Sequence, residues 1–110
     1  MYEKIDFILE MIENIEKIIK RHKGIVDALN DFEGQMAIFM GLAQIGETLN
    51  KFDDYFIEKF DLKEEKLGAY YTRNYIVHDY EGVDLMIVEN ILRVHLPILK
   101  EKLLKAKNEN

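Results

Sequence analysis

The sequence of 110 residues contains no cysteine and no serine, and it has only one proline and six glycines. The absence of cysteine excludes disulfide bonds, thiol catalysis and cysteine-ligated metal sites, and it fits a reducing cytoplasm. The absence of serine excludes a serine-based catalytic triad. The low content of proline and glycine leaves little material for the many turns of an all-β fold. Any chemistry must therefore come from other side chains on a largely helical framework.

Long hydrophobic runs are also missing, since none approaches the roughly 20 residues that a membrane-spanning helix needs. The N-terminal stretch MYEKIDFILEMIEN is acidic rather than the basic start of a secretion signal, so we expect a cytoplasmic protein without membrane contact. The formal net charge of −6 argues against nucleic-acid binding over a broad surface, and we expect no DNA partner, but a small local RNA site stays open. The length predicts one domain, residues 1–110, with a single core.

Apolar residues recur at intervals of three and four along most of the chain, which indicates amphipathic helices. We predict four long helices: about residues 2–22, 33–52 and 63–79, and a fourth that follows an N-cap at Asp84. The stretch GIVDALNDF is interpreted as a connection or a short helical turn, and DDYFIEKFDL as a connection. Pro97 is expected to kink the fourth helix. The fold class is therefore predicted to be all-α, an antiparallel up-and-down four-helix bundle.

The predicted second helix is apolar on two sides. One stripe consists of Met36, Phe39, Met40 and Ala43, and the other of Ile38, Leu42, Ile45 and Leu49. Such a helix is either central in its domain or covered by a partner chain. Its glycines Gly34, Gly41 and Gly46 cost about 1 kcal/mol each relative to alanine, so close helix approach is expected as compensation. Glu47, which follows the apolar run, is interpreted as a paired or surface carboxylate.

Several polar and aromatic residues have an ordinary structural interpretation. The basic stretch 20–23 (KRHK) is expected to be a solvated helix end, because cations favour the C-terminus of a helix. His95 lies on the apolar stripe of the fourth helix and is expected to pack in the core. Tyr70, Tyr71 and Tyr75 are expected to be core or interface aromatics.

The segment YYTRNYIVHDYEGVD, residues 70–84, gathers the side chains that can perform chemistry. His78 can give and take protons near neutral pH, and Arg73 is a permanent cation that matches phosphate oxygens. With Asn74 and Tyr80 nearby, they supply proton transfer and anion stabilisation, the two needs of phosphodiester cleavage without a metal. Histidine pairs at helical spacing and glycine-rich phosphate loops, which would indicate other sites, are absent from the sequence.

The spacing within this segment sets a geometric condition. On a regular helix Arg73 and His78 are about 140° apart, whereas Arg73 and Tyr80 fall nearly on one face. The arginine–histidine pair therefore needs an irregular helix end or a site shared between two chains. A two-fold dimer would bring two copies of the helix together. From the residues alone, an aromatic helix with a histidine in it by chance stays an alternative.

The segment RNYIVHDY carries an R-x-x-x-x-H-x-Y motif, and here the chain resembles the HepT-like toxins, a branch of the HEPN ribonucleases. The segment LAQIGETLN resembles the second-helix region of that family, and GVDLMIVENILRVHLPILKEKL resembles its final helix. Family members often carry proline and tryptophan just before the motif helix, whereas FDLKEEKLGAYYTRN has neither.

The resemblance implies a HEPN-type homodimer whose two motifs form a composite cleft, and an endoribonuclease that uses no metal or other cofactor. In it, the ribose 2′-hydroxyl of RNA attacks the adjacent phosphate. His78 would be the general acid and base, Arg73 the phosphate ligand, and Asn74 the residue that orients them. The resemblance also implies a type II-like toxin–antitoxin pair, in which a minimal nucleotidyltransferase antitoxin (MntA) transfers AMP to Tyr80.

Two other functions stay open at this stage. The domain could be a non-catalytic binding module that serves as the partner or substrate of a nucleotidyltransferase, which the net negative charge slightly favours. It could also be a purely structural bundle, in which case substitutions of Arg73 and His78 would alter stability only.

Overall fold

The computed structural model describes residues 1–109, and that range contains helices and no β-strand. The long helical segments are α1 (Tyr2–Arg21), α3 (Phe32–Leu49), α5 (Lys63–His78) and a C-terminal helix formed by α6 (Leu85–Asn90), the π-helical turn η2 (Ile91–His95) and α7 (Leu96–Asn108). The connections contain α2 (Ile25–Asn30), α4 (Asp54–Lys59) and the 3₁₀ turn η1 (Tyr80–Gly82). Between residues 1 and 109, no helix is long and apolar enough to cross a membrane.

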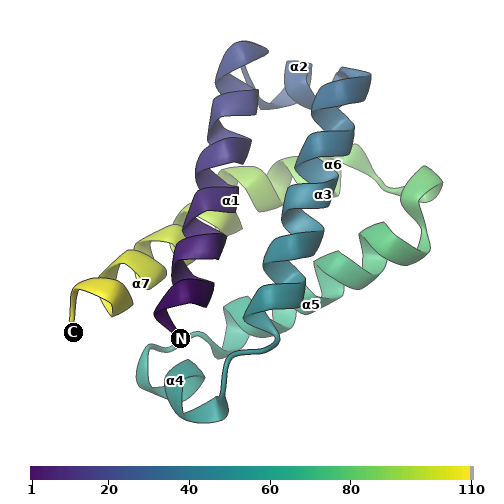
Figure 1. Cartoon of the computed structure of the whole chain (residues 1–110). Helices are drawn as coiled ribbons and strands as arrows, with labels where there is room; N and C mark the ends of the chain where they lie inside the picture. The colour runs from purple at the N-terminus through teal and green to yellow at the C-terminus, as the bar shows by residue number, and fades with distance from the viewer. Residues whose placement is uncertain (110) are drawn as a thin grey trace.

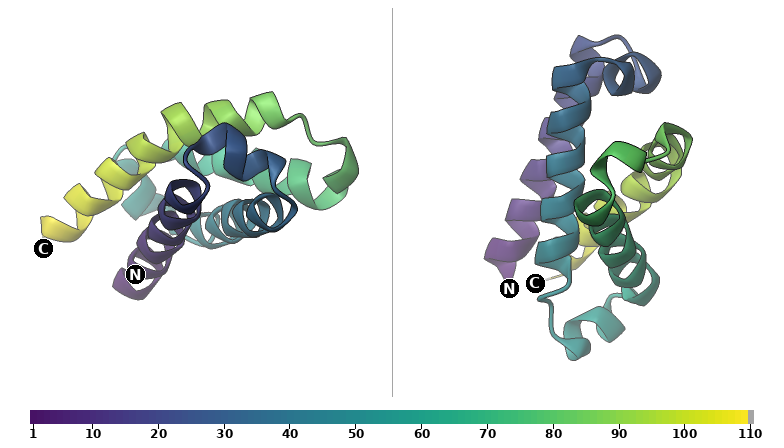
Figure 2. Two further views of the ribbon diagram at one scale, coloured as in Figure 1. Left: turned by 90° about the horizontal axis from the view of Figure 1, so that it is seen from above. Right: turned by 90° about the vertical axis from the view of Figure 1, so that its right-hand side faces the viewer.

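The helices pack as a bundle with α3 in the middle. The helices α1 and α3 lie side by side in opposite directions, and α5 and the C-terminal helix run obliquely to them (Figures 1 and 2). The most extensive contact is that of α3 with α5, while α1 packs on both α3 and α7. The predicted all-α bundle is therefore confirmed, and α3 is the helix on which α5 rests.

The core consists mainly of aliphatic side chains, together with Phe39 and Phe52, and each long helix contributes to it. The fully buried side chains of α1 and α3 include Ile5, Ile8, Ile12, Ile15, Ile38, Phe39, Ile45 and Leu49. Burial of one such side chain contributes about 1.5–3 kcal/mol, so the helices are held together mainly by this core. The second predicted stripe of α3 is thus in the core, whereas Met36 and Met40 of the first stripe face outward.

The glycines of α3 stand where this helix touches its neighbours. A Cβ atom on Gly41 would lie 2.9 Å from the side chain of Ile15 on α1. A Cβ atom on Gly46 would lie 2.7 Å from the Cβ of Arg73 on α5. Gly34 approaches α2 in the same way. The predicted close approach is therefore confirmed, and Gly46 brings α3 directly against the arginine of the motif.

The chain between α3 and α5 differs from the prediction. The stretch interpreted as a connection contains α4, and α3 ends at Leu49 rather than near Phe52. The carboxylate of Asp53 caps α4 by accepting a hydrogen bond of 2.8 Å from the backbone N–H of Phe56. The ring of Phe56 also packs on those of Phe52 and Phe60. An N-cap and an aromatic cluster thus stabilise a helix too short to show a clear apolar period. In the preceding connection, GIVDALNDF, the predicted helical turn is confirmed as α2.

The C-terminal helix starts as predicted and is irregular where a proline requires it. The carboxylate of Asp84 accepts a hydrogen bond of 2.9 Å from the backbone N–H of Met86, which confirms the predicted N-cap. Pro97 stands in the first turn of α7, directly after the π-helical turn. Proline has no backbone N–H, and its ring collides with the carbonyl four residues earlier in a regular helix. The predicted disturbance at Pro97 thus takes the form of a wider turn, through which the helix continues.

Candidate active site

Most of the motif lies on α5, which stays regular throughout. This helix runs without interruption to His78, and the backbone leaves helical geometry only at Asp79, with φ −144° and ψ 49°. Arg73 and His78 therefore both stand in regular helix, about 140° apart around its axis. An irregular helix end that would bring them together is not present. Within one chain, the two side chains point in different directions.

Arg73 faces α3 and is held there by two contacts. Its Nε lies 3.1 Å from Oε2 of Glu47, and its Nη1 donates a hydrogen bond of 2.9 Å to Oδ1 of Asn74. Glu47 is therefore a paired carboxylate near the surface, as predicted. Because a guanidinium group has five N–H groups, these contacts leave donors for a phosphate. Asn74 fixes the orientation of the arginine, which fits the orienting role that the resemblance implies.

His78 is the last residue of α5, and its side chain is exposed. Among residues 1–109, the imidazole of His78 has no hydrogen bond or ion pair with another residue. Its neighbour Asp79 directs its carboxylate toward Gly82, where an added Cβ would lie 2.6 Å from both carboxylate oxygens. The imidazole of His78 is therefore free to meet a ligand or another chain.

Tyr80 lies beyond the helix but still contacts α3. It belongs to η1, and its ring stands edge-on to that of Phe39, with centroids 5.3 Å apart and an interplanar angle of 74°. The side chain keeps 42% of its surface exposed. Both residues therefore contact α3, Arg73 through Glu47 and Tyr80 through Phe39. The two contact points are about 12 Å apart along that helix.

The three other tyrosines of the segment have different positions. The hydroxyl of Tyr75 accepts a hydrogen bond of 2.7 Å from the backbone N–H of Asp84, which ties α5 to the start of α6. Tyr75 thus has a structural role, in line with the prediction. Tyr70 and Tyr71 are exposed and stand with ring centroids 6.3 Å apart, so they are not core residues of a single chain.

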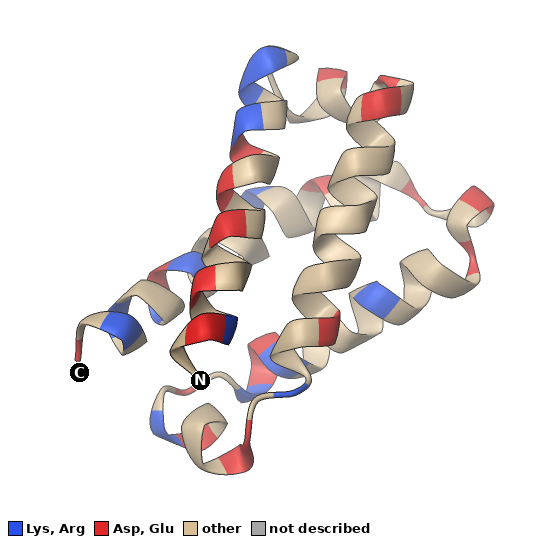
Figure 3. Ribbon diagram, viewed as in Figure 1, with Lys and Arg blue, Asp and Glu red and all other residues tan. Residues whose placement is uncertain are grey.

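An exposed apolar surface lies beside these residues. On α3, Met36 and Met40 point outward, and Figure 3 shows that this helix carries no charge between the acidic residues near its two ends. On α5, Tyr70 and Val77 are exposed one turn on either side of Arg73. We call these four side chains the outer surface of α3 and α5; the Arg73–Glu47 ion pair joins its two halves. These exposed apolar side chains are available for contact with another chain.

The comparison with protein families agrees with this arrangement. The model of a family described as ribonuclease HepT-like matches residues 8–106, which is nearly the whole chain and includes every residue of the motif. The chain belongs to the HepT-like ribonuclease family. No curated protein and no solved structure matches it. At the level of the family, membership places the chain among the HEPN ribonucleases and toxins.

Sequence reasoning missed some residues that support the HepT-like motif. Phe39 was assigned to an apolar stripe, whereas it is both a core residue and the ring against which Tyr80 rests. Nothing local in the sequence pairs Phe39 with Tyr80, because the contact depends on how α3 and η1 meet. The hydrogen bond between Tyr75 and Asp84 was missed for the same reason. The turn signal YEGVD, however, could have indicated that the chain reverses after α5, which brings residues near the end of α5 close to the start of α6.

The prediction for His95 of this HepT-like chain was wrong. Instead of packing in the core, His95 is exposed and lines a pocket between α5 and the C-terminal helix. A π-helical turn holds more residues than an α-helical one, so the buried stripe passes from Leu92 to Leu96 and skips position 95. The basic stretch at the end of α1 was interpreted correctly except at His22, which is half-buried and bonded to Asp31.

Within the described residues 1–109, no three His, Asp or Glu side chains of the HepT-like chain converge as ligands of a metal ion would. The pocket that His95 lines also includes none of the four motif residues. The motif itself offers an arginine, an amide, an imidazole and a phenol at the surface of α5 and η1.

Proposed function

We propose that this HepT-like protein is the toxin of a type II-like toxin–antitoxin pair, and that it cleaves RNA as a two-fold dimer without a metal. The observation that carries the proposal is the position of Arg73 and His78. Both side chains are accessible to a ligand, but regular helix holds them about 140° apart. A second chain docked on the outer surface of α3 and α5 would cover its exposed apolar side chains and bring a second motif beside the first.

In the proposed reaction, an imidazole of His78 removes the proton from a ribose 2′-hydroxyl, and the 2′-oxygen attacks the adjacent phosphorus. The bond from phosphorus to the 5′-oxygen breaks, and a protonated imidazole gives its proton to that leaving oxygen. The products are a 2′,3′-cyclic phosphate and a 5′-hydroxyl end. The guanidinium of Arg73 stabilises the negative charge of the transition state on the non-bridging oxygens. In each shared site, His78 of one chain and Arg73 of the other chain act together, and the imidazole that takes up the 2′-hydroxyl proton is the one that gives a proton to the leaving oxygen.

The position of Tyr80 supports the proposed control by a nucleotidyltransferase partner. In the proposed modification, the phenolic oxygen attacks the α-phosphorus of ATP, pyrophosphate leaves, and the phenolic proton passes to a base of the transferase. The ring is fixed on Phe39 while much of its surface stays open, so the acceptor is both positioned and accessible. An added AMP would place a negative charge and bulk on the same side of the chain as Arg73, and it would repel RNA.

Complementation between inactive chains tests the shared site. Arg73→Ala and His78→Ala are each expected to lower RNA cleavage by a factor on the order of 100 to 10,000, the usual range for loss of a catalytic acid–base or anion-stabilising group. A mixed dimer of the two variants contains one site with both residues, so mixing them should restore activity. Arg93→Ala, which removes an exposed arginine outside the motif, serves as the control and should cleave like the wild type.

The assay is run with and without EDTA, and with a second RNA that has a 2′-deoxy sugar at the cleaved position. The proposed mechanism requires that EDTA has no effect and that the deoxy substrate stays intact. If the mixed variants stay inactive although they form dimers, the site is not shared between chains. If His78→Ala cleaves RNA as fast as the wild type, the catalytic assignment is wrong.

The alternative is a non-catalytic binding module that a nucleotidyltransferase modifies or binds. The net charge of −6 favours it, because RNA is repelled by an acidic protein. A purified chain that accepts AMP on Tyr80 but leaves every tested RNA intact would establish this function instead.

A further inference from the structure

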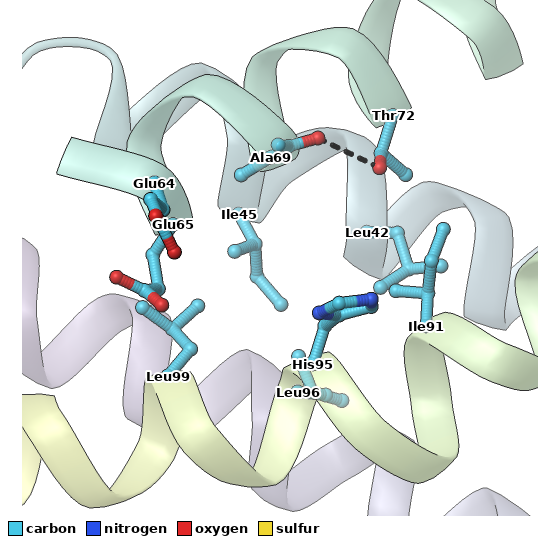
Figure 4. A pocket seen from close by; sticks show the side chains of 11 residues that line it. Leu42, Ile45, Glu64, Glu65, Ala69, Thr72, Ile91, His95, Leu96 and Leu99 are labelled. Carbon is cyan, nitrogen blue, oxygen red and sulfur yellow. Dashed lines mark hydrogen bonds between the residues drawn. The ribbon is translucent and has the colours of Figure 1, made fainter. Parts of the chain in front are cut away.

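A pocket of about 300 Å³ opens between α5 and the C-terminal helix, with α3 as its floor (Figure 4). Its apolar lining consists of Leu42, Ile45, Ile91, Leu96 and Leu99. Ligand sites in proteins are typically concavities of this size or larger, mostly apolar, with a few polar groups that fix the orientation of the ligand. The pocket has no motif residue in its lining, so it is separate from the proposed ribonuclease site.

Polar groups stand at the two ends of this pocket. Figure 4 shows the carboxylates of Glu64 and Glu65 at one end and the imidazole of His95 at the other, with aliphatic side chains between them. The hydroxyl of Thr72 also lines the pocket, and it donates a hydrogen bond of 2.9 Å to the backbone carbonyl of Gly68. Because its proton is already used, the Thr72 oxygen can only accept a hydrogen bond from a ligand.

The charges in the pocket are not balanced. Glu65 forms an ion pair of 3.0 Å with Lys102, which neutralises one carboxylate. The carboxylate of Glu64 has no hydrogen bond or ion pair with another residue in the part of the chain that the structure describes. The acidic end of the pocket therefore offers one carboxylate that has no cationic side chain as partner, next to apolar walls. An anion would be repelled here, whereas a cation with an apolar body would complement both features.

We infer that this pocket binds an organic cation whose charged end is an alkylammonium or guanidinium group and whose body is apolar. The ammonium or guanidinium group contacts Glu64, and the apolar body lies on Ile45 and Leu99. The same chemistry is offered by a free amine and by a lysine or arginine side chain of a partner protein. The assignment goes beyond the proposed ribonuclease function and does not depend on it.

One wall of the pocket allows a direct steric test. A Cβ atom added to Gly68 would meet no atom within 4 Å, so the backbone of α5 borders open space there. Gly68→Leu would place its side chain in that space and fill part of the pocket. Because leucine is also a better helix former than glycine by roughly 0.7 kcal/mol, the substitution should not weaken α5 itself.

The experiment measures binding of hexylamine to the full chain by NMR titration, next to hexanol and hexanoate, which have the same apolar body. Hexylamine is expected to bind at least tenfold tighter than either. A second arm uses acetyl-leucyl-lysine amide and its norleucine analogue, which lacks the charge. Tighter binding of the lysine peptide than of hexylamine assigns the cation to a partner protein, and the reverse assigns it to a free amine.

Three variants complete the test. Glu64→Gln should weaken hexylamine binding at least tenfold and leave hexanol binding unchanged, and Gly68→Leu should abolish both. Glu58→Gln, which removes an exposed carboxylate on α4, should bind like the wild type. The inference is overturned if hexylamine binds no better than hexanol, or if Glu64→Gln binds it as the wild type does. Thermal unfolding confirms that Gly68→Leu is folded, and if it is not, Glu64→Gln decides the result.

Discussion

The ring of Tyr80 stands edge-on to the ring of Phe39, so a residue of the motif rests on a residue of the core. Edge-to-face pairs contribute about 0.5–1.5 kcal/mol beyond the area that they bury. This contact fixes the turn that follows α5, and it makes the position of Tyr80 depend on the packing of α3.

A double-mutant cycle should measure this contact. Phe39→Leu keeps most of the core volume, and Tyr80→Leu removes the second ring, so the pair should show a coupling energy of about 0.5–1.5 kcal/mol in urea unfolding. A control cycle that combines Phe39→Leu with Tyr55→Leu, at an exposed tyrosine on α4, should show no coupling energy. A coupling energy within error of zero for Phe39 and Tyr80 would mean that the ring contact does not stabilise the turn.

Alanine at two glycines should have opposite effects on stability. Gly46→Ala would force its Cβ against the Ala69 carbonyl and the Arg73 side chain, and overpacking of this kind costs about 1–3 kcal/mol. Gly68→Ala enters open space and gains roughly 1 kcal/mol of helix propensity. Denaturant unfolding of the two variants measures both effects. Equal effects at the two positions would show that the approach of α3 to α5 is not tight at Gly46.

Stability should depend on pH through His22 and Asp31. The Ile18 carbonyl and the Asp31 carboxylate raise the pKa of His22 above 6.5, so its stabilising contribution is full below that pH and is lost as pH rises through the folded-state pKa. The Gly34 N–H and His22 lower the pKa of Asp31 below 3.8. The stabilising contribution of Asp31 is therefore full above pH 3.8 and is lost as the pH falls through its folded-state pKa.

The contribution of this pair is therefore largest between about pH 4 and pH 6.5. His22→Gln should lose more stability at pH 6 than at pH 8, when thermal unfolding is measured at both. If His22→Gln loses the same amount at both pH values, the histidine gains no stabilising charge in the folded state.

A charge on the outer surface of α3 and α5 should separate the proposed dimer. Met40 is 61% exposed, so Met40→Lys can fold as a monomer, but a buried lysine in an interface costs several kcal/mol. Analytical ultracentrifugation should show the shift to monomers, with a parallel loss of RNA cleavage. Met86, which is 78% exposed on α6, gives the matched control, and Met86→Lys should stay dimeric and active. A dimeric Met40→Lys protein would place the interface elsewhere.

The sequence predicted the long helices well, because their apolar residues repeat at helical spacing over four or more turns. It also identified the N-cap at Asp84 and the contact glycines of α3. The helix α4 was missed because six residues are too few for a period, although Asp53 before an aromatic run is a usable N-cap signal. His95 was misplaced because spacings of three and four are both helical, and only the π-helical turn decides between them.

The candidate site could be predicted as a set of residues but not as an arrangement. The types and the order of Arg73, Asn74, His78 and Tyr80 are compatible with phosphate chemistry, and the resemblance to the HepT-like toxins favours this interpretation over a chance histidine on an aromatic helix. The ion pair of Arg73 with Glu47 joins positions 26 residues apart, and the ring contact of Tyr80 with Phe39 joins positions 41 residues apart. Both contacts form only when α3 packs on α5 and η1. Contacts of this kind are determined by tertiary packing rather than by local pattern.

The regular course of α5 to His78 has a consequence for dosage. Under the proposed mechanism, one chain carries all the catalytic groups but never a complete site, so the active species is a pair. At concentrations well below the dissociation constant of the dimer, the amount of active enzyme then rises with the square of the chain concentration. A cell could hold a small excess of such a protein almost without effect, and a modest further increase would release most of its activity.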